Sequence, residues 1–245
     1  EGNDLKKLFG LEKQGAILSQ EGATIDAFAF THELLVHSIK KGAVQVYDNT
    51  PVESIRHDAK KVIVTSPDGH TLTSRWLVIA CGYESQKYLS KQVEISSSTY
   101  SIASEPFSTK EFWHKNAMIW ETADPYLYIR RTDSNRLLVG GKDDKFHNPD
   151  KRDRKLKEKS FSLKNSFSKL FPSIDFRIDF SWGGYFGKTK DGLPYIGSVA
   201  ERPNTYFALG FGGNGVLFST IGAEIITDIL SGRKNSNLSI FSFTR

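Results

Sequence analysis

Residues 205–230, TYFALGFGGNGVLFSTIGAEIITDIL, place a short apolar strand, a glycine-rich loop and an apolar helix in immediate succession. The loop Gly210–Gly215 matches the pattern G-x-G-x-x-G that opens dinucleotide-binding units. Residues 216–245 contain neither a second buried strand nor an acidic residue about 20 positions on that would hold a ribose. The segment therefore predicts a glycine turn that lets backbone approach a ligand, with free N–H groups at the start of the helix. The alternative is a plain turn between a strand and a helix.

On the N-terminal side of this loop, the spacing of apolar residues alternates between that of helices and that of strands. Residues 27–41 carry a helical apolar pattern that Gly42 ends, and the apolar run 76–80 predicts a strand buried on both faces. Alternating runs between 99 and 180 predict a separate antiparallel sheet, accompanied by a charged helix over 151–170. The other expected elements are a short helix and linker at 1–14, extended segments at 15–25, 43–47, 52–55 and 62–65, strands at 176–187, 195–197 and 206–209, and a last helix at 215–231 closed by Gly232.

Strands thus occur in two settings, which predict an α+β fold with two parts. Residues 1–98 and 181–245 are expected to form a helix-backed sheet, and residues 99–180 an antiparallel sheet inserted into it. A sheet domain that is interrupted by another sheet domain is typical of a cofactor-binding module that carries a substrate lid.

The composition excludes several classes of protein. The 245 residues include one cysteine, Cys81, which excludes an internal disulfide and a multi-cysteine zinc site and favours a reducing, cytoplasmic setting. Cys81 is interpreted as a small core side chain rather than a nucleophile. No apolar run approaches the ~18 residues of a membrane span. The polar start, Glu1–Leu5, is not that of a signal peptide.

Much of the net charge of +5 comes from the block Lys151–Lys159. Acidic residues are mixed into this block and no stacking aromatics are interleaved, which favours a solvated helix face over a nucleic-acid or membrane patch. His32 and His37 are five positions apart, whereas a spacing of about four places two ligands on one helix face. We therefore expect neither a metal site nor a nucleic-acid partner.

Four segments of the chain follow one another in a characteristic order. They are 22–46, 50–55, 77–83 and the stretch 182–216, which includes Trp182-Gly183-Gly184, Thr189–Gly197 and Asn204–Val216. Together they resemble the D-amino-acid oxidase, glycine oxidase and sarcosine oxidase family of FAD-dependent oxidoreductases. The resemblance implies non-covalent FAD, a small amine or amino-acid substrate, and hydride transfer from substrate to flavin N5. It also implies that the N-terminal βαβ unit with the true phosphate-binding glycines lies outside this chain.

The resemblance assigns the contacts with FAD to three places. Val52 corresponds to a position whose backbone meets the adenine, and Ala80, Cys81 and Gly82 to a strand end that closes over the diphosphate and ribose. The loop along the pyrimidine edge of the flavin corresponds to Gly212, Gly213, Asn214, Gly215 and Val216. There, the start of the helix would stabilise negative charge on the reduced flavin.

The substrate side resembles glycine oxidases less closely. Phe186 occupies the position of an arginine that grips the substrate carboxylate in that subgroup, and a phenylalanine cannot do so. Tyr128 corresponds to a tyrosine of the substrate pocket, and Arg130 shares its strand face and is the candidate anchor. Arg131, on the same strand, is the other candidate anchor, and the resemblance implies that Lys142 and Asp143 lie near the same pocket.

Three other interpretations stay open. Arg130 could be a surface residue beside a core tyrosine. The chain could be a non-catalytic fragment that cannot hold FAD. Because the carboxylate anchor of glycine oxidases is absent, the enzyme could instead act on a C–O bond, in a hydroxy-acid substrate.

Overall fold

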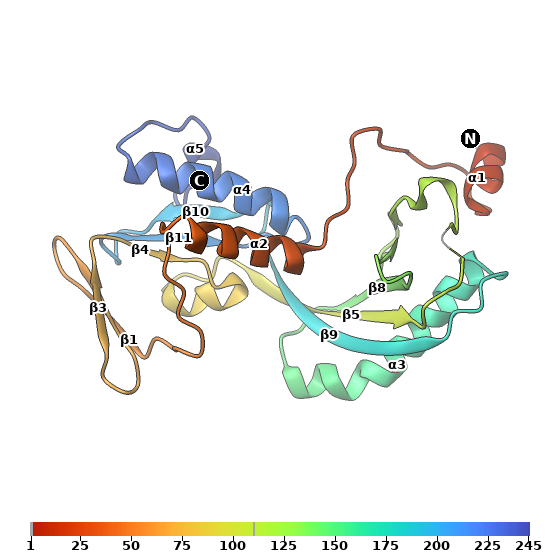
Figure 1. Cartoon of the computed structure of the whole chain (residues 1–245), viewed down its shortest axis with the longest axis horizontal. Helices are drawn as coiled ribbons and strands as arrows, with labels where there is room; N and C mark the ends of the chain where they lie inside the picture. The colour runs from red at the N-terminus through yellow and green to blue at the C-terminus, as the bar shows by residue number, and fades with distance from the viewer. Residues whose placement is uncertain (1, 110) are drawn as a thin grey trace. The chain divides into compact units, whose positions relative to one another are not determined.

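A computed structural model of the protein describes residues 2–109 and 111–245 (Figure 1). The chain forms two compact units. The first, which we call the sheet unit, comprises Glu1–Thr24 and Ser96–Tyr185, and the second, the glycine-loop unit, comprises Ile25–Ile95 and Phe186–Arg245. The segment before residue 25 was expected in the second unit. It clusters with the first because Leu5 and Leu11 are buried in the core of the sheet unit.

The sheet unit contains one five-stranded sheet with the strand order β6–β7–β8–β5–β9. Strand β5 pairs with β8, and β7 pairs with β6 and β8, all in the antiparallel sense that the alternating runs predicted. The elements are α1 (Gly2–Phe9), β5 (Ile95–Ser104), η2 (His114–Asn116), β6 (Ile119–Trp120), β7 (Leu127–Arg131), β8 (Leu137–Asp144), α3 (Pro149–Leu170) and β9 (Ile178–Lys188).

Alternation along the strands divides this sheet into a buried face and an open face. Leu127 and Ile129 of β7 are 1% and 0% exposed and belong to the same core as Leu163 and Phe167 of α3. The Phe167 ring also packs against Phe176, with ring centroids 4.9 Å apart. Burial of each such side chain contributes about 1.5–3 kcal/mol. The alternate residues of β7 therefore lie on the opposite face.

The glycine-loop unit contains two three-stranded sheets, β10–β11–β4 and β1–β2–β3. In the first, β10 pairs with β11 in the antiparallel sense, and β11 pairs with β4 in the parallel sense. The elements are α2 (Ala27–Lys40), β1 (Ser54–His57), β2 (Val62–Thr65), β3 (Thr71–Ser74), β4 (Leu77–Ile79), η1 (Gly82–Tyr88), β10 (Tyr195–Ser198), β11 (Thr205–Leu209), α4 (Gly215–Leu230) and α5 (Leu238–Phe241).

Helix α4 covers the β10–β11 part of its sheet. Phe218 and Ile225 of α4 share one core cluster with Ile196 of β10 and Ala208 of β11. This packing confirms the predicted helix-backed sheet. It also fixes the start of α4 at the carboxyl end of β11.

Three expectations about individual segments were wrong. Residues 15–25 and 43–47 are not strands, since no described strand pairs with either segment. Strand β4 forms but is not buried on both faces, because β11 is its one described neighbour and Val78 is 42% exposed. A run of apolar residues indicates that a strand is suited to burial, but it does not show whether strands or helices are present to cover both of its faces.

Helix α2 forms where the apolar pattern predicted it. The Asp26 side chain accepts a hydrogen bond from the Ala29 N–H at 3.0 Å, and Gly42 follows the helix with a φ of +67°. None of its side chains is buried. Within residues 2–109 and 111–245, no helix combines the length and apolar character needed to cross a membrane.

Candidate functional site

The glycine loop lies at the carboxyl edge of the β10–β11–β4 sheet. Because β4 and β11 are parallel neighbours, with Ile79 opposite Phe207, their carboxyl ends reach the same edge. Gly210 and Gly212 have φ angles of +80° and +54°, a region that favours glycine. The Gly212 N–H donates to the Gly187 carbonyl at 2.9 Å, which ties the loop to β9. Ligands of parallel sheets bind at such an edge.

The first turn of α4 offers backbone donors without a competing side chain. Asn214 is the residue before the helix, and its side chain makes no capping hydrogen bond. No acidic residue occupies the first turn. A Cβ placed on Gly213 or Gly215 would meet no atom within 4 Å. A flat ligand could therefore approach this backbone closely, and the partial positive charge of the helix start would favour an electron-rich atom.

The structure brings Ala80, Cys81 and Gly82 to the same sheet edge as the glycine loop. They follow β4, and Gly82 opens η1 with a φ of +60°. The Cys81 N–H donates to Ser85 Oγ at 3.1 Å. Cys81 is exposed, so its interpretation as a core side chain was wrong. It lies two residues beyond Ile79, the buried end of β4, where the chain leaves the sheet.

Val52 is not part of the sheet that carries the glycine loop and Ala80–Gly82. It belongs to the extended segment before β1, outside the β10–β11–β4 sheet, and its side chain is 45% exposed. Among the described residues, no hydrogen bond joins Val52 to the glycine loop. Its assignment to the adenine therefore stays a prediction.

A buried carboxyl group that the sequence did not indicate lies against the loop. Glu94 is 3% exposed, and neither of its carboxyl oxygens has a hydrogen-bond partner among the described residues. A Cβ on Gly187 would collide with this carboxyl group, and one on Gly210 would lie 3.8 Å from Oε2. Burial raises the pKa of Glu94, while the nearby Gly210 backbone acts in the opposite direction. A single glutamate between Val93 and Ile95 gives no sequence signal of this burial.

Glu94 should make stability depend on pH in an unusual direction. Because its pKa is raised in the folded protein, the folded state binds the proton more tightly than the unfolded state, and stability falls as pH rises from the ordinary glutamate pKa through the folded one. In Glu94→Gln this loss disappears. Melting temperatures of the two proteins between about pH 4 and pH 8 test the prediction.

Glu201→Gln is the matched control for this measurement. The pKa of the exposed Glu201 is lowered by hydrogen bonds from its own backbone and from Ser90, so its contribution is lost as pH falls, which is the opposite sign. Equal pH slopes for wild type and Glu94→Gln would contradict the burial argument.

Tyr128 lies on the open face of the five-stranded sheet, and its side chain extends from β7 over the neighbouring strand β8. Its hydroxyl hydrogen-bonds with Ser101 Oγ of β5 at 2.9 Å. Its ring covers Gly140 of β8, where any Cβ would collide with the ring. Gly141, with a φ of +128°, lies against the Tyr126 carbonyl. The Gly140–Gly141 pair is thus required for the position of Tyr128, a role that the sequence did not reveal.

Arg130 is half-buried on the same strand face as Tyr128. Among the described residues, its guanidinium makes no hydrogen bond or ion pair. Its neighbour Arg131, in contrast, donates from Nε to Asn135 Oδ1 at 3.0 Å. Because Arg130 has no such partner among the described residues, its donors are available to an acidic ligand.

Tyr126 lies immediately before the same strand. Burial, followed by the charge of Asp143, raises the pKa of the Tyr126 phenol, so that this group stays neutral in the physiological range.

Phe186 lies on β9 within the glycine-loop unit and is half-buried. Lys188 Nζ lies 4.7 Å from the centre of its ring, a cation–π arrangement. The structure thus gives Phe186 an apolar role and no acid-binding group of its own. Lys142, with a φ of +56°, accepts a hydrogen bond on its carbonyl from Lys159 Nζ at 2.7 Å.

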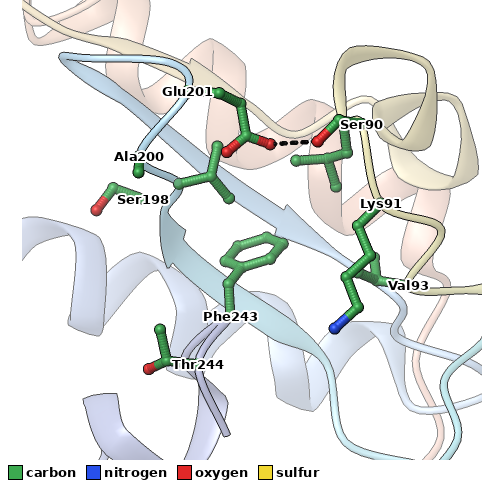
Figure 2. A pocket seen from close by; sticks show the side chains of 10 residues that line it. Ser90, Lys91, Val93, Ser198, Ala200, Glu201, Phe243 and Thr244 are labelled. Carbon is green, nitrogen blue, oxygen red and sulfur yellow. Dashed lines mark hydrogen bonds between the residues drawn. The ribbon is translucent and has the colours of Figure 1, made fainter.

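A separate cavity of about 260 Å³ lies at the end of β10, where Ser198 and the residues after it form part of its wall (Figure 2). Its polar groups include Lys91 and the pair Ser90–Glu201, whose side chains hydrogen-bond at 2.9 Å, and the Phe243 ring forms part of its wall. None of the residues assigned above to cofactor or substrate lines it. The cavity is therefore separate from both the glycine-loop edge and the open sheet face, each of which is considered by itself as a candidate site.

Known proteins resemble the chain over almost its whole length. The family described as FAD dependent oxidoreductase matches residues 1–229. Glycine oxidase of Bacillus subtilis (strain 168) is 24% identical over 225 residues, which cover 90% of this chain and 58% of that protein. Glycine oxidase of Bacillus licheniformis is 31% identical over 189 residues, which cover 76% of this chain and 49% of that protein.

The fold is also that of solved enzymes. The structure of iminodiacetate oxidase from Chelativorans sp. BNC1 matches with a TM-score of 0.79 at 16% identity, over 99% of this chain and 65% of that one. The chain spans about half to three-fifths of the length of the two glycine oxidases. Because the family match extends over residues 1–229, the chain belongs to the FAD dependent oxidoreductase family.

Proposed function

We propose that this chain is the C-terminal part of an FAD-dependent oxidoreductase that oxidises a carbon–nitrogen bond of an amine or amino acid. The observation that carries the proposal is the uncapped start of α4 behind the glycine turn Gly210–Gly215. The family match supports FAD as the ligand of this backbone. The two glycine oxidases support the substrate class.

The residues at the sheet edge fit a non-covalent FAD. The backbone of Gly212–Val216 would hold the flavin ring, since Gly213 and Gly215 leave open space beside it. Ala80, Cys81 and Gly82 would contact the diphosphate and ribose, and Val52 the adenine. The part of the family's FAD site that holds the pyrophosphate on a βαβ unit is assigned to the remainder of the complete protein, by which we mean the full-length polypeptide that contains this chain.

Bound FAD would supply the acceptor, flavin N5, for the hydride that leaves the substrate α-carbon. The protein's own part is electrostatic. The free N–H groups at the start of α4 favour negative charge at the edge of the ring, and they are fixed before the reaction by the hydrogen bond between Gly212 and Gly187. A preorganised dipole of this kind needs no rearrangement when charge develops.

The open sheet face would bind the substrate. Arg130 is proposed to bind a substrate carboxylate, because it is half-buried and has no protein partner among the described residues. The Tyr128 phenol, held by Ser101, would line the same face. Phe186, which belongs to the glycine-loop unit, would offer an apolar side chain that anchors no charge.

Anaerobic mixing of the FAD-loaded complete protein with candidate substrates tests the proposed function. Amino acids and secondary amines are expected to bleach the flavin absorbance, whereas the matching 2-hydroxy acids are not. Bleaching by hydroxy acids alone would assign oxidation of a C–O bond and overturn the proposal.

A further inference from the structure

The last residues of the chain wrap the edge strand β10. Phe241 packs against Phe218 on the α4 side, with ring centroids 6.3 Å apart. Phe243 stacks on Tyr195 at 5.2 Å and belongs to the cluster on the other side of the sheet. Figure 2 shows the Phe243 ring and Thr244 where this segment runs past the sheet. The segment 238–245 therefore holds both faces of β10 at its open edge.

Arg245 extends this contact to the turn before β10. Its Nε donates to Asp191 Oδ2 at 2.8 Å and its Nη2 to Asp191 Oδ1 at 3.1 Å, a bidentate pair. The same guanidinium donates to the carbonyls of Pro194 at 2.8 Å and Leu193 at 2.7 Å, and it lies 3.7 Å from the centre of the Tyr195 ring. Its side chain is 13% exposed. The Arg245 guanidinium holds the pKa of Asp191 well below its usual range.

The Asp191–Pro194 turn contacts the glycine loop through Thr189. Thr189 Oγ1 donates to the Leu193 carbonyl at 2.8 Å and lies 3.3 Å from Asp191 Oδ1. Its methyl group, Cγ2, faces Gly210 so closely that a Cβ there would lie 2.5 Å away. One continuous set of contacts thus connects Arg245, Asp191, Thr189 and the first residue of the loop.

We propose that Arg245 is a positioning residue that sets the glycine loop through the Asp191–Pro194 turn and Thr189. Its importance for the cofactor rests on the proposed function, in which Gly212–Val216 contact the flavin. Arg245 binds four oxygens from three residues of one turn, so a residue without its planar fork cannot hold all of them. Lysine at this position would keep the charge and lose the geometry.

Amide hydrogen exchange and FAD titration of the complete protein test this inference. In Arg245→Gln, the N–H groups of Gly212 and Asn214, which are hydrogen-bonded in the loop, are expected to exchange about tenfold faster than in wild type, as loss of a charged hydrogen bond implies. Amides in the β10–β11 ladder should change less. The FAD dissociation constant should rise by about tenfold, with Arg245→Lys intermediate.

Arg233→Gln is the matched control, because Arg233 also pairs with an aspartate, Asp228, at 2.8 Å but at the far end of α4. It should leave the loop exchange and FAD affinity unchanged. Adding Asp191→Asn to Arg245→Gln should have little further effect, since both changes remove one interaction. A lower melting temperature with the loop exchanging no faster than the ladder would overturn the inference. Failure of wild type to bind FAD would instead reject the proposed function, while the exchange result would still decide the role of Arg245.

Discussion

Replacing Arg130 by methionine in the complete protein is expected to raise the KM for a carboxylate-bearing substrate by about a hundredfold or more. Arg130 is a half-buried cation without a protein partner among the described residues, on the strand face that it shares with Tyr128. Truncation of one partner in a buried, hydrogen-bonded charge pair costs about 2–5 kcal/mol. Methionine keeps the length and the apolar contacts of the side chain, so the fold and the FAD content should be unchanged.

Two controls make this prediction specific. Arg131→Met removes the adjacent arginine, whose Nε is bonded to Asn135 in the hairpin, and should leave KM unchanged. An amine without a carboxylate should be oxidised equally well by wild type and Arg130→Met. Steady-state kinetics with both substrates provide the measurement. An unchanged KM for the carboxylate-bearing substrate would assign the anchor elsewhere.

Replacing Gly210 by alanine is expected to destabilise the glycine-loop unit by about 2–5 kcal/mol and to abolish tight FAD binding. Two costs add. The φ of +80° is unfavourable for a residue with a Cβ, and that Cβ would lie 2.5 Å from Thr189 Cγ2. Thr189 is 9% exposed and held by its hydroxyl, so its methyl group has little room to move. Chemical unfolding and FAD titration measure the two effects.

The clash and the backbone strain can be separated by two further variants. Gly192→Ala has a similar φ of +75° but no atom within 4 Å, so it should show the strain alone. Adding Thr189→Ser to Gly210→Ala removes the offending methyl group and keeps the hydroxyl, and should recover part of the stability. A double variant no better than Gly210→Ala would show that contact with Thr189 is not what limits the loop.

The local order of elements could be predicted from the sequence where short-range signals agree. The apolar run before Gly210, the glycines and the periodic helix after Gly215 together predicted β11, its turn and α4. Alternation likewise identified β7 and β8, because one face of their sheet is buried against α3. In both cases the periodicity of the sequence and the tertiary burial point to the same arrangement.

The errors arose where burial depends on partners that a local pattern cannot supply. The segment 43–47 has strand-forming residues but no described strand pairs with it. Val78 has the character of a core residue but lies in a strand with one described neighbour. Cys81 follows an apolar run and is exposed because the chain leaves the sheet there. Each error concerns the neighbour of a segment and not the segment itself.

The residues proposed to contact ligands could be named from the sequence, whereas the residues that support them could not. The glycine loop was named from its motif, Tyr128 from the family resemblance, and Arg130 from the strand face that it shares with Tyr128. Glu94 and Arg245 could not be found in this way, because their roles depend on contacts with Gly187, Gly210 and Asp191, which are distant in sequence. Gly140 could not be found either, because a side chain at this position is excluded by the Tyr128 ring of the neighbouring strand.

The FAD content of the complete protein tests the central claim most directly. The protein would be purified under gentle conditions, saturated with FAD, separated from free FAD and analysed by absorbance before and after denaturation. We expect about one FAD per polypeptide, all of it released on denaturation, because the contacts of the loop and of the start of α4 are non-covalent. A folded complete protein that retains no FAD after saturation would contradict the claim.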